Sequence, residues 1–249
     1  MAPGGSKVLR TPENLAVVTG AGSGIGRAIV LELTRWGVSC CLVGRTISKL
    51  QDVASLTQEM GVESIPVAVD LRDPQSTSAL HNKLKSLGRQ VELLVHSAAT
   101  MRVSRFEDST VQEFSDLLAA NLLAPFALTK ELLPDIRATR GQIAFVNSSI
   151  VNHPAAGTVQ YAASKHALKG LADGLRQEVN VSGVRVISVY PGRTATPLQA
   201  SLYEIEGRVY VPEELLQAED VAEILVRALA LPHTAEVTDI MIRPASKPK

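Results

Sequence analysis

The chain has 249 residues, a length that suits one large α/β domain, and 45% of them are apolar, enough to form a sizeable core. Its 25 lysines and arginines are matched by 25 aspartates and glutamates, which excludes an electrostatic case for a nucleic-acid partner or an anionic membrane surface. No apolar run approaches the ~18 residues of a membrane-spanning helix. The first residues lack the apolar core of a signal peptide, so we expect a cytoplasmic protein with a flexible arm over 1–13.

Short apolar runs alternate with helical patterns along the whole chain. Continuous apolar runs are typical of parallel strands that are covered on both faces. The expected strands are 15–19, 38–43, 64–69, 91–96, 142–147, 184–190 and 236–242. The expected helices are 24–36, 47–60, 74–88, 108–134, 157–181 and 218–231. These repeated βα units predict an α/β protein with a doubly wound parallel sheet, in one domain over 14–244 followed by a frayed tail at 245–249.

The first expected strand leads directly into the glycine-rich segment TGAGSGIG. Gly20, Gly24 and Gly26 match the pattern TGxxxGxG, and a helical pattern follows at once. Such a turn lets the backbone approach a phosphate while the N-terminus of the helix offers free N–H groups. A glycine-rich turn can also be only a tight connection, but its place between the first strand and a helix favours dinucleotide binding.

The second expected strand ends at Gly44, Arg45 and Thr46, where NAD-binding proteins of this arrangement carry an acidic residue for the ribose hydroxyls. A guanidinium can bind a 2′-phosphate bidentately, whereas a carboxylate would repel it. We therefore expect NADP(H) to be preferred over NAD(H). The alternative is that Arg45 is an ordinary surface arginine.

The only cysteines, Cys40 and Cys41, are adjacent within the second apolar run. Neighbouring residues of a strand point to opposite faces, so the two thiols are poorly placed to form a disulfide with each other. No further cysteine completes a metal-ligand set. We expect two buried free thiols in a reducing compartment and no metal site.

Four polar residues form a candidate catalytic set. Tyr161 and Lys165 lie one helical turn apart in YAASK, Ser148 ends the fifth strand, and Asn121 interrupts an apolar helical pattern. Singly, each has an ordinary explanation as a surface pair, a helix cap or a buried polar link. Their joint spacing behind the glycine turn favours catalysis, because a nearby positive charge stabilises an ionised phenol and tunes it for proton transfer.

With these motifs combined, the chain resembles the short-chain dehydrogenase/reductase family over nearly its whole length, from TGAGSGIG through VAVDLRD, ANLLAPF, NSSIV and YAASK to YPGRTATP. The resemblance implies a three-layer Rossmann fold with a seven-stranded parallel sheet. It also implies that Tyr161 is the general acid in reduction and the general base in oxidation. Lys165 would lower the pKa of the phenol and hold the nicotinamide ribose. Ser148 would bind the substrate oxygen, and Asn121 would support a proton-relay water.

The same resemblance implies a set of cofactor contacts around the carboxyl ends of the strands. Asp70 and Leu71 would lie at the adenine, and Thr194 and Thr196 at the nicotinamide carboxamide. The full set is Gly20, Ser23, Gly24, Ile25, Gly26, Arg45, Thr46, Asp70, Leu71, Ser97, Ala98, Ala99, Tyr161, Lys165, Pro191, Gly192, Thr194 and Thr196.

The sequence departs from the family pattern in two places. His96, Ser97, Ala98 and Ala99 stand where the family usually has NNAG, and we interpret His96 as a structural residue in an asparagine's position. The C-terminal residues lack the family's common glycine-containing ending, which puts any tetramer contact made by such a tail in doubt. The segment 197–212 is expected to be an insertion beside the cofactor site, either an apolar lid or a solvated loop.

These features predict an NADP(H)-dependent oxidoreductase that interconverts a small-molecule carbonyl and a secondary alcohol, with ketone reduction as the expected direction. The alternative is a non-catalytic NADP(H)-binding regulator or scaffold, for which a complete acid–base set is superfluous. Lyase or epimerase chemistry on a sugar nucleotide is disfavoured because such enzymes generally carry a second substrate domain. A homodimer or homotetramer formed through the helices near 108–134 and 157–181 is expected from the resemblance.

Overall fold

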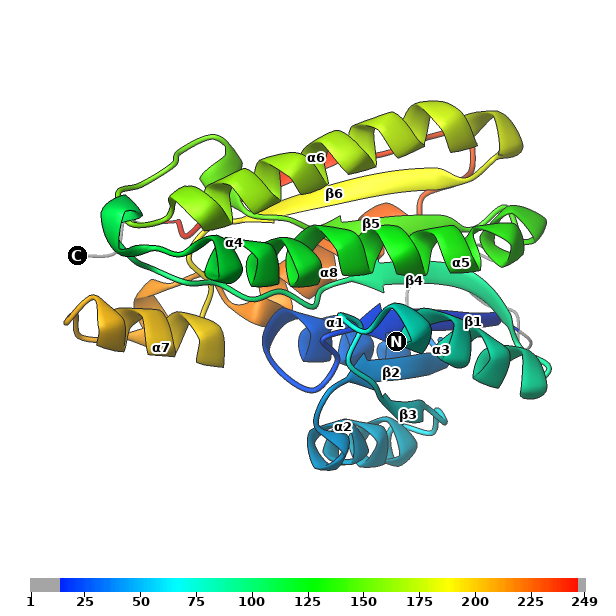
Figure 1. Ribbon diagram of the computed structural model, residues 1–249. Coiled ribbons are helices and arrows are strands. Elements are labelled where there is room, and N and C mark those ends of the chain that lie inside the picture. The colour runs from blue at the N-terminus through cyan, green and yellow to red at the C-terminus, as the bar shows by residue number, and fades with distance from the viewer. Residues whose placement is uncertain (1–13, 246–249) are drawn as a thin grey trace.

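The computed structural model describes residues 14–245; the expected arm at 1–13 lies outside them, as does the expected frayed tail apart from Ala245. Seven parallel strands form one sheet in the order β3-β2-β1-β4-β5-β6-β7 (Figure 1). From β1 the chain adds strands outward to β3 on one side, and from β4 it adds them outward to β7 on the other side. This arrangement confirms the doubly wound sheet predicted from the sequence. The strands are β1 Asn14–Thr19, β2 Cys40–Gly44, β3 Ile65–Ala68, β4 Gln90–His96, β5 Gln142–Val146, β6 Arg185–Pro191 and β7 Asp239–Ile242.

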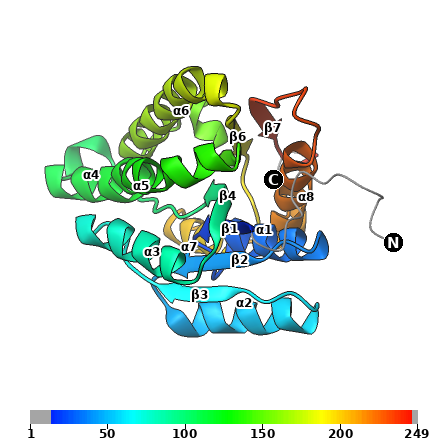
Figure 2. The ribbon, with the colours of Figure 1, turned by 90° about the vertical axis from the view of Figure 1, so that its right-hand side faces the viewer.

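Helices cover both faces of the sheet and give the three-layer architecture (Figure 2). One layer contains α1 Gly24–Arg35, α2 Ile47–Glu59 and α8 Ala218–Leu229. The other contains α3 Pro74–Ser86, α5 Ala124–Ala138 and α6 Val159–Val179. Because the central strands β1, β2, β5 and β6 are covered on both sides, their residues are mostly apolar without alternation, whereas the edge strands β3 and β7 are partly exposed.

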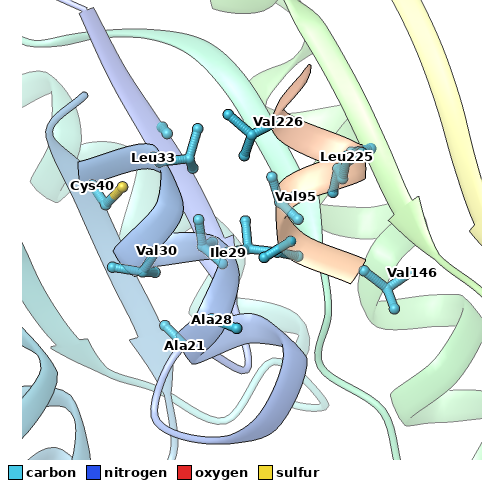
Figure 3. Packing of buried hydrophobic residues seen from close by; sticks show 14 of the residues in the cluster. Ala21, Ala28, Ile29, Val30, Leu33, Cys40, Val95, Val146, Leu225 and Val226 are labelled. Atoms are coloured by element: carbon cyan, nitrogen blue, oxygen red, sulfur yellow. The ribbon is translucent and has the colours of Figure 1, made fainter. Parts of the chain in front are cut away.

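The packing of α1 against α8 fixes the helix that follows the glycine turn. Ile29 and Leu33 of α1 meet Leu225 and Val226 of α8, and all four side chains are buried (Figure 3). Truncating side chains of this kind to alanine typically costs about 2–5 kcal/mol. The N-terminus of α1 is therefore held firmly at the carboxyl edge of the sheet.

The two cysteines lie on opposite faces of β2, as the sequence predicted. Cys40 belongs to the core beneath α1 and α8, and Cys41 to the core beneath α3, α5 and α6. Both are free thiols, and burial raises the pKa of Cys41 to about 12 and that of Cys40 further still. Such thiols remain protonated at neutral pH and fill space in the core.

The predicted helix over 108–134 is divided in the structure. It begins at α4 Val111–Leu118, where Thr110 and Glu113 form a reciprocal capping box, and it continues through a π-helical turn, Ala119–Leu123, into α5. Pro134 lies inside α5 without ending it, so the helix extends four residues beyond the prediction. The π-helical turn contains Asn121, one of the predicted catalytic residues.

The same helical stretch, Val111–Ala138, is long and apolar enough by composition to cross a membrane, with a mean hydropathy of 1.2. Its side chains Leu128, Leu132 and Ile136 are fully buried in the core against the sheet. Packing within the Rossmann fold therefore accounts for its apolar composition.

The segment 197–212 contains a helix that the sequence reasoning did not identify. Helix α7 spans Pro197–Ile205; Thr196 caps it by accepting a hydrogen bond from Gln199 N at 3.2 Å, and Pro197 occupies the first turn. In Figure 1, α7 projects beyond the carboxyl ends of the strands. Short 3₁₀ turns lie at Phe106–Asp108, Ser149–Val151, Asn180–Ser182 and Pro212–Glu214.

Candidate active site

The glycine turn after β1 lies directly against the segment after β4. A Cβ atom on Gly20, whose φ is 68°, would lie 2.9 Å from the backbone of Ala98, and one on Gly26 would lie 2.3 Å from the carbonyl oxygen of Gly20. The hydroxyl of Thr19 joins the two segments, since it accepts hydrogen bonds from the backbone N–H groups of Ser97 and Ala98 at 3.0 and 3.1 Å. A side chain at either glycine would collide with these backbone atoms, so the close packing of the turn requires glycine at both positions.

A cavity of about 340 Å³ opens at the carboxyl edge of the sheet, beside this turn. It brings together most of the residues for which sequence reasoning predicted a role. Those in its wall are Gly20, Ser23, Gly24, Ile25, Gly26, Arg45, Thr46, Asp70, Leu71, Ser97, Ala98, Ala99, Tyr161, Lys165 and Thr196. Pro191, Gly192, Thr194, Asn121 and Ser148 do not line it.

Tyr161 and Lys165 lie on one side of α6 at the inner wall of this cavity. Both side chains are buried, and the Lys165 Nζ atom lies 5.9 Å from the centre of the Tyr161 ring. The ammonium donates a hydrogen bond to the carbonyl oxygen of Val146, at the end of β5, at 3.1 Å. Helix α6 and strand β5 thus place a phenol and an ammonium next to each other beside the glycine turn.

Burial controls the titration of both groups in the protein without a ligand. It raises the pKa of Tyr161 to about 12, with a hydrogen bond to Ser148 acting in the opposite direction, and it lowers the pKa of Lys165 to about 8. From the sequence we expected a neighbouring charge to lower the pKa of the phenol, but in the protein without a ligand that pKa is raised. At neutral pH the phenol holds its proton, which is the form that a general acid needs.

The lowered pKa of Lys165 predicts a pH-dependent stability. Between the unfolded value of 10.5 and the folded value of about 8, the unfolded chain binds the proton more tightly, so stability is lost as the pH falls. Relative to Lys165→Met, the wild-type free energy of unfolding should rise by about 1.5 kcal/mol from about pH 8 to about 9.5. Urea unfolding of both proteins across this range measures the difference. Parallel pH profiles would contradict the prediction.

Asn121 links the loop after β4 to helix α6. Its amide donates hydrogen bonds to Thr100 O at 2.9 Å and to Ser164 Oγ at 3.0 Å, and its carbonyl oxygen accepts from Thr100 N at 2.9 Å. Ser164 in turn donates to the backbone carbonyl of Tyr161 at 2.8 Å. The fully buried side chain therefore helps to fix the backbone from which Tyr161 projects.

Ser148 lies immediately beyond the end of β5 and caps the following 3₁₀ turn, where its hydroxyl accepts a hydrogen bond from Ile150 N at 3.2 Å. The neighbouring Asn147 donates to the backbone carbonyl of Lys165 at 3.2 Å. The end of β5 is thus tied to α6 next to the phenol, with which Ser148 also interacts.

His96 has the contacts of a structural residue. Its ring is buried, stacks on Phe145 at a centroid distance of 5.0 Å, and shares a hydrogen bond of 2.8 Å with the hydroxyl of Thr129 on α5. Burial lowers its pKa to about 3, so the imidazole is neutral. The side chain joins β4 to α5, which fits the interpretation made from the sequence.

Two cations in the cavity wall were missed by the sequence reasoning. Lys49 lies in the first turn of α2, and Arg72 follows β3. Arg72 binds Asp70 through its Nε and Nη2 atoms and lowers the pKa of that carboxyl to about 2, with a smaller contribution from Arg45. Lys49 lies four residues after Arg45, but Arg45 precedes the extended N-cap Thr46 of α2, so helical spacing does not identify the pair from the sequence.

The fold and the cavity place the chain among the Rossmann-fold proteins, with ionisable side chains at the end of the sheet where such proteins bind ligands. The sequence matches the short chain dehydrogenase family over residues 14–207, and the chain belongs to this family of oxidoreductases. The family resemblance read from the sequence motifs is therefore confirmed.

Individual relatives agree with this membership. An uncharacterized oxidoreductase of Staphylococcus saprophyticus is 30% identical over 234 residues, covering 93% of this chain and 97% of the relative. An alcohol dehydrogenase of Thermococcus sibiricus, solved with 5-hydroxy-NADP, superposes with a TM-score of 0.85 at 27% identity. The match covers 95% of this chain and 99% of the alcohol dehydrogenase. Actinorhodin polyketide ketoreductase, solved with NADPH, also superposes with a TM-score of 0.85. It is 25% identical, and the match covers 92% of this chain and 95% of the ketoreductase.

Proposed function

We propose that this protein is an NADP(H)-dependent oxidoreductase that interconverts a ketone and a secondary alcohol, with reduction as its working direction. The observation that carries the proposal is the position of Tyr161 and Lys165 in the wall of the cavity that the glycine turn bounds. A pure nucleotide-binding regulator needs no buried phenol beside an ammonium, so catalysis explains the arrangement better.

The residues of the cavity fit a nicotinamide dinucleotide. The glycine turn leaves its backbone open, and the N-terminus of the twelve-residue helix α1 supplies unpaired N–H groups and a positive dipole end for a pyrophosphate. Ser97, Ala98 and Ala99 are small enough for close approach of the adenosine, and Thr196 faces the glycine turn from the opposite wall. A bound nicotinamide would supply or accept the hydride.

The charge at one end of the cavity supports a preference for the phosphorylated cofactor. Arg45, Lys49 and Arg72 all line this region, and the one carboxylate among them, Asp70, is paired with Arg72. A 2′-phosphate would therefore meet an excess of positive charge. The Thermococcus alcohol dehydrogenase and the ketoreductase, solved with 5-hydroxy-NADP and NADPH respectively, are consistent with this preference.

Replacing Arg45 by alanine should weaken NADPH binding by about tenfold and change NADH binding by less than about twofold, because one charge-assisted contact to the phosphate is lost. Titration of nicotinamide fluorescence measures both affinities. Arg35→Ala, which removes an exposed arginine at the end of α1, is the matched control. Equal losses for both cofactors would contradict a role of Arg45 in discrimination.

The chain's own residues would handle the proton of the reaction. In reduction, Tyr161 gives its phenolic proton to the substrate oxygen as the carbon receives the hydride, and Ser148 holds that oxygen by a hydrogen bond. In oxidation, the phenol must first ionise, and the ammonium of Lys165 favours the phenolate electrostatically. The buried side chain of Asn121 uses both N–H donors and one oxygen lone pair within the protein, so we assign to its main chain in the π-helical turn the role of holding a relay water near Lys165.

The proposal extends to partners and location. The substrate is a small carbonyl compound or alcohol, and we propose a cytoplasmic homodimer or homotetramer without nucleic-acid or membrane partners. Three large apolar side chains near these helices are exposed to solvent, as an oligomer interface requires: Leu123 at the end of the π-helical turn, Phe126 on α5 and Val159 at the start of α6.

A screen of ketones and aldehydes with purified protein tests the proposed function, with consumption of NADPH followed by its absorbance. Turnover that depends on both the carbonyl compound and NADPH supports the proposal. Protein that binds NADPH but reduces no compound of the screen, and oxidises no corresponding alcohol, would favour the regulator.

A further inference from the structure

A bidentate ion pair joins the two ends of the α7 segment. Arg193, which precedes the helix, donates hydrogen bonds from Nη1 and Nη2 to the two carboxylate oxygens of Glu206, which ends it, at 2.9 and 3.0 Å. Arg208 donates to the same carboxylate at 3.2 Å. The two guanidinium groups keep the pKa of Glu206 below its usual value, so the carboxylate is ionised at neutral pH. One carboxylate thus binds two arginines.

The two arginines enclose Tyr203, which is buried at the inner side of α7. The guanidinium carbons of Arg193 and Arg208 lie 5.1 and 4.7 Å from the centre of its ring, and Tyr210 approaches the ring edge-on at 5.5 Å. Cation–π contacts of this kind stabilise a fold modestly, but they require both cations to stay in place. The carboxylate of Glu206 contributes to holding them there.

The other end of α7 forms part of the cofactor cavity. Thr196, Pro197 and Leu198 lie in its wall, and the methyl group of Thr196 is 3.1 Å from the place of a Cβ atom on Gly24. The backbone before the helix is paired with Leu216, which donates to Arg193 O at 3.1 Å and accepts from Ala195 N at 2.8 Å. This pairing anchors Arg193 to the rest of the molecule, and the Arg193–Glu206 ion pair extends that anchor to the other end of α7.

We propose that Glu206 is a positioning residue for cofactor binding: through Arg193 and Arg208 it holds α7 against the molecule, with Thr196 facing the glycine turn. The inference rests on the proposed function, because it concerns the affinity for NADP(H). Without the carboxylate, Arg193 loses the bidentate ion pair that ties the end of α7 to the backbone before the helix. Helix α7 then leaves its position more often, and the bound cofactor dissociates faster.

The test compares Glu206→Gln with Glu223→Gln, which removes the carboxylate of an exposed ion pair on α8, Arg227–Glu223, at 2.8 Å. We expect Glu206→Gln to raise the Kd and KM for NADPH about fivefold or more, with kcat within about twofold of wild type. Glu206→Asp, which retains the charge, should recover part of the affinity. Glu223→Gln should match wild type in each measurement.

Limited proteolysis with trypsin tests the position of α7 without any cofactor. Cleavage after Arg208, identified by mass spectrometry, should be at least about fivefold faster in Glu206→Gln than in wild type or Glu223→Gln, because this exposed bond enters the protease only when the local backbone opens. Arg193→Gln removes the same ion pair from the other side and should give the same acceleration.

The two measurements separate the failure of this inference from the failure of the proposed function. Wild-type protein that does not bind NADPH would overturn the proposed function, and with it the inference about cofactor affinity. If wild type binds NADPH but neither Glu206→Gln nor Arg193→Gln changes cleavage or affinity, the positioning role of Glu206 is wrong. Should Glu206→Gln fail to fold, Arg193→Gln decides the question by the same two measurements.

Discussion

Replacing Tyr161 by phenylalanine is expected to lower kcat by about 10²–10⁴-fold while leaving the Kd for NADPH within about threefold of wild type. The phenylalanine ring retains the packing of this buried side chain on α6, and only the hydroxyl is lost. That hydroxyl is the proton donor to the substrate in the proposed mechanism, whereas the buried ammonium of Lys165, also in the described cavity wall, donates to the carbonyl oxygen of Val146. Steady-state turnover and nicotinamide fluorescence measure the two quantities separately.

Tyr190→Phe provides the control for this substitution. Tyr190 is as deeply buried as Tyr161 but lies in β6 and does not line the cavity, so its hydroxyl can be removed without touching the proposed chemistry. Its kcat should stay within about twofold of wild type. Substantial activity in Tyr161→Phe would show that another group donates the proton.

The strands were predictable because of where they lie. The central strands are covered by helices on both faces, so most of their residues are apolar, and runs such as Leu15–Thr19 need no long-range information to be recognised. The candidate site was predictable because its residues occur in short motifs at fixed positions relative to those strands. The glycine turn follows β1, Ser148 follows β5, and YAASK opens α6.

The features that escaped prediction depend on tertiary contacts. Nothing in the sequence AANLL breaks a helix, and the π-helical turn there accompanies the hydrogen bonds of Asn121 to Thr100 and Ser164, which are distant in the chain. The direction of the phenol pKa was likewise hidden, because the sequence shows the neighbouring Lys165 but not the burial that outweighs it. Charged side chains such as Arg72 carry no pattern that distinguishes a cavity wall from a surface.

Helix α7 is a different case, because the sequence contains the signals of a helix in this segment. Thr196 before Pro197 is a common start of a helix, and Leu198, Leu202 and Ile205 recur at helical spacing. The exposed position of α7 beyond the sheet explains why the segment looked like an irregular insertion. Its contribution to the cavity wall now connects this insertion to the site.

Within the glycine turn, Gly26 makes the closest backbone approach and is the residue of this turn least able to accept a side chain. A Cβ atom there would lie 2.3 Å from the carbonyl oxygen and 2.7 Å from the carbonyl carbon of Gly20, which are backbone atoms that no rotamer change can move. Gly20 itself has a φ of 68° and packs on the backbone of Ala98, so the strain cannot be relieved by a shift in that direction. The first turn of α1 must therefore move away from the glycine turn.

Gly26→Ala is accordingly expected to destabilise the protein by about 1–3 kcal/mol and to weaken NADPH binding about 100-fold, because the free N–H groups at the start of α1 lose their alignment. Gly170→Ala on α6 is the matched control: a Cβ atom there meets nothing within 4 Å, and alanine in a helix should leave stability unchanged or raise it by up to ~1 kcal/mol. Urea unfolding and fluorescence titration of both variants measure these effects. If Gly26→Ala retains wild-type affinity for NADPH, the cofactor does not depend on the close packing of this turn, and the proposed placement of the pyrophosphate at the N-terminus of α1 is wrong.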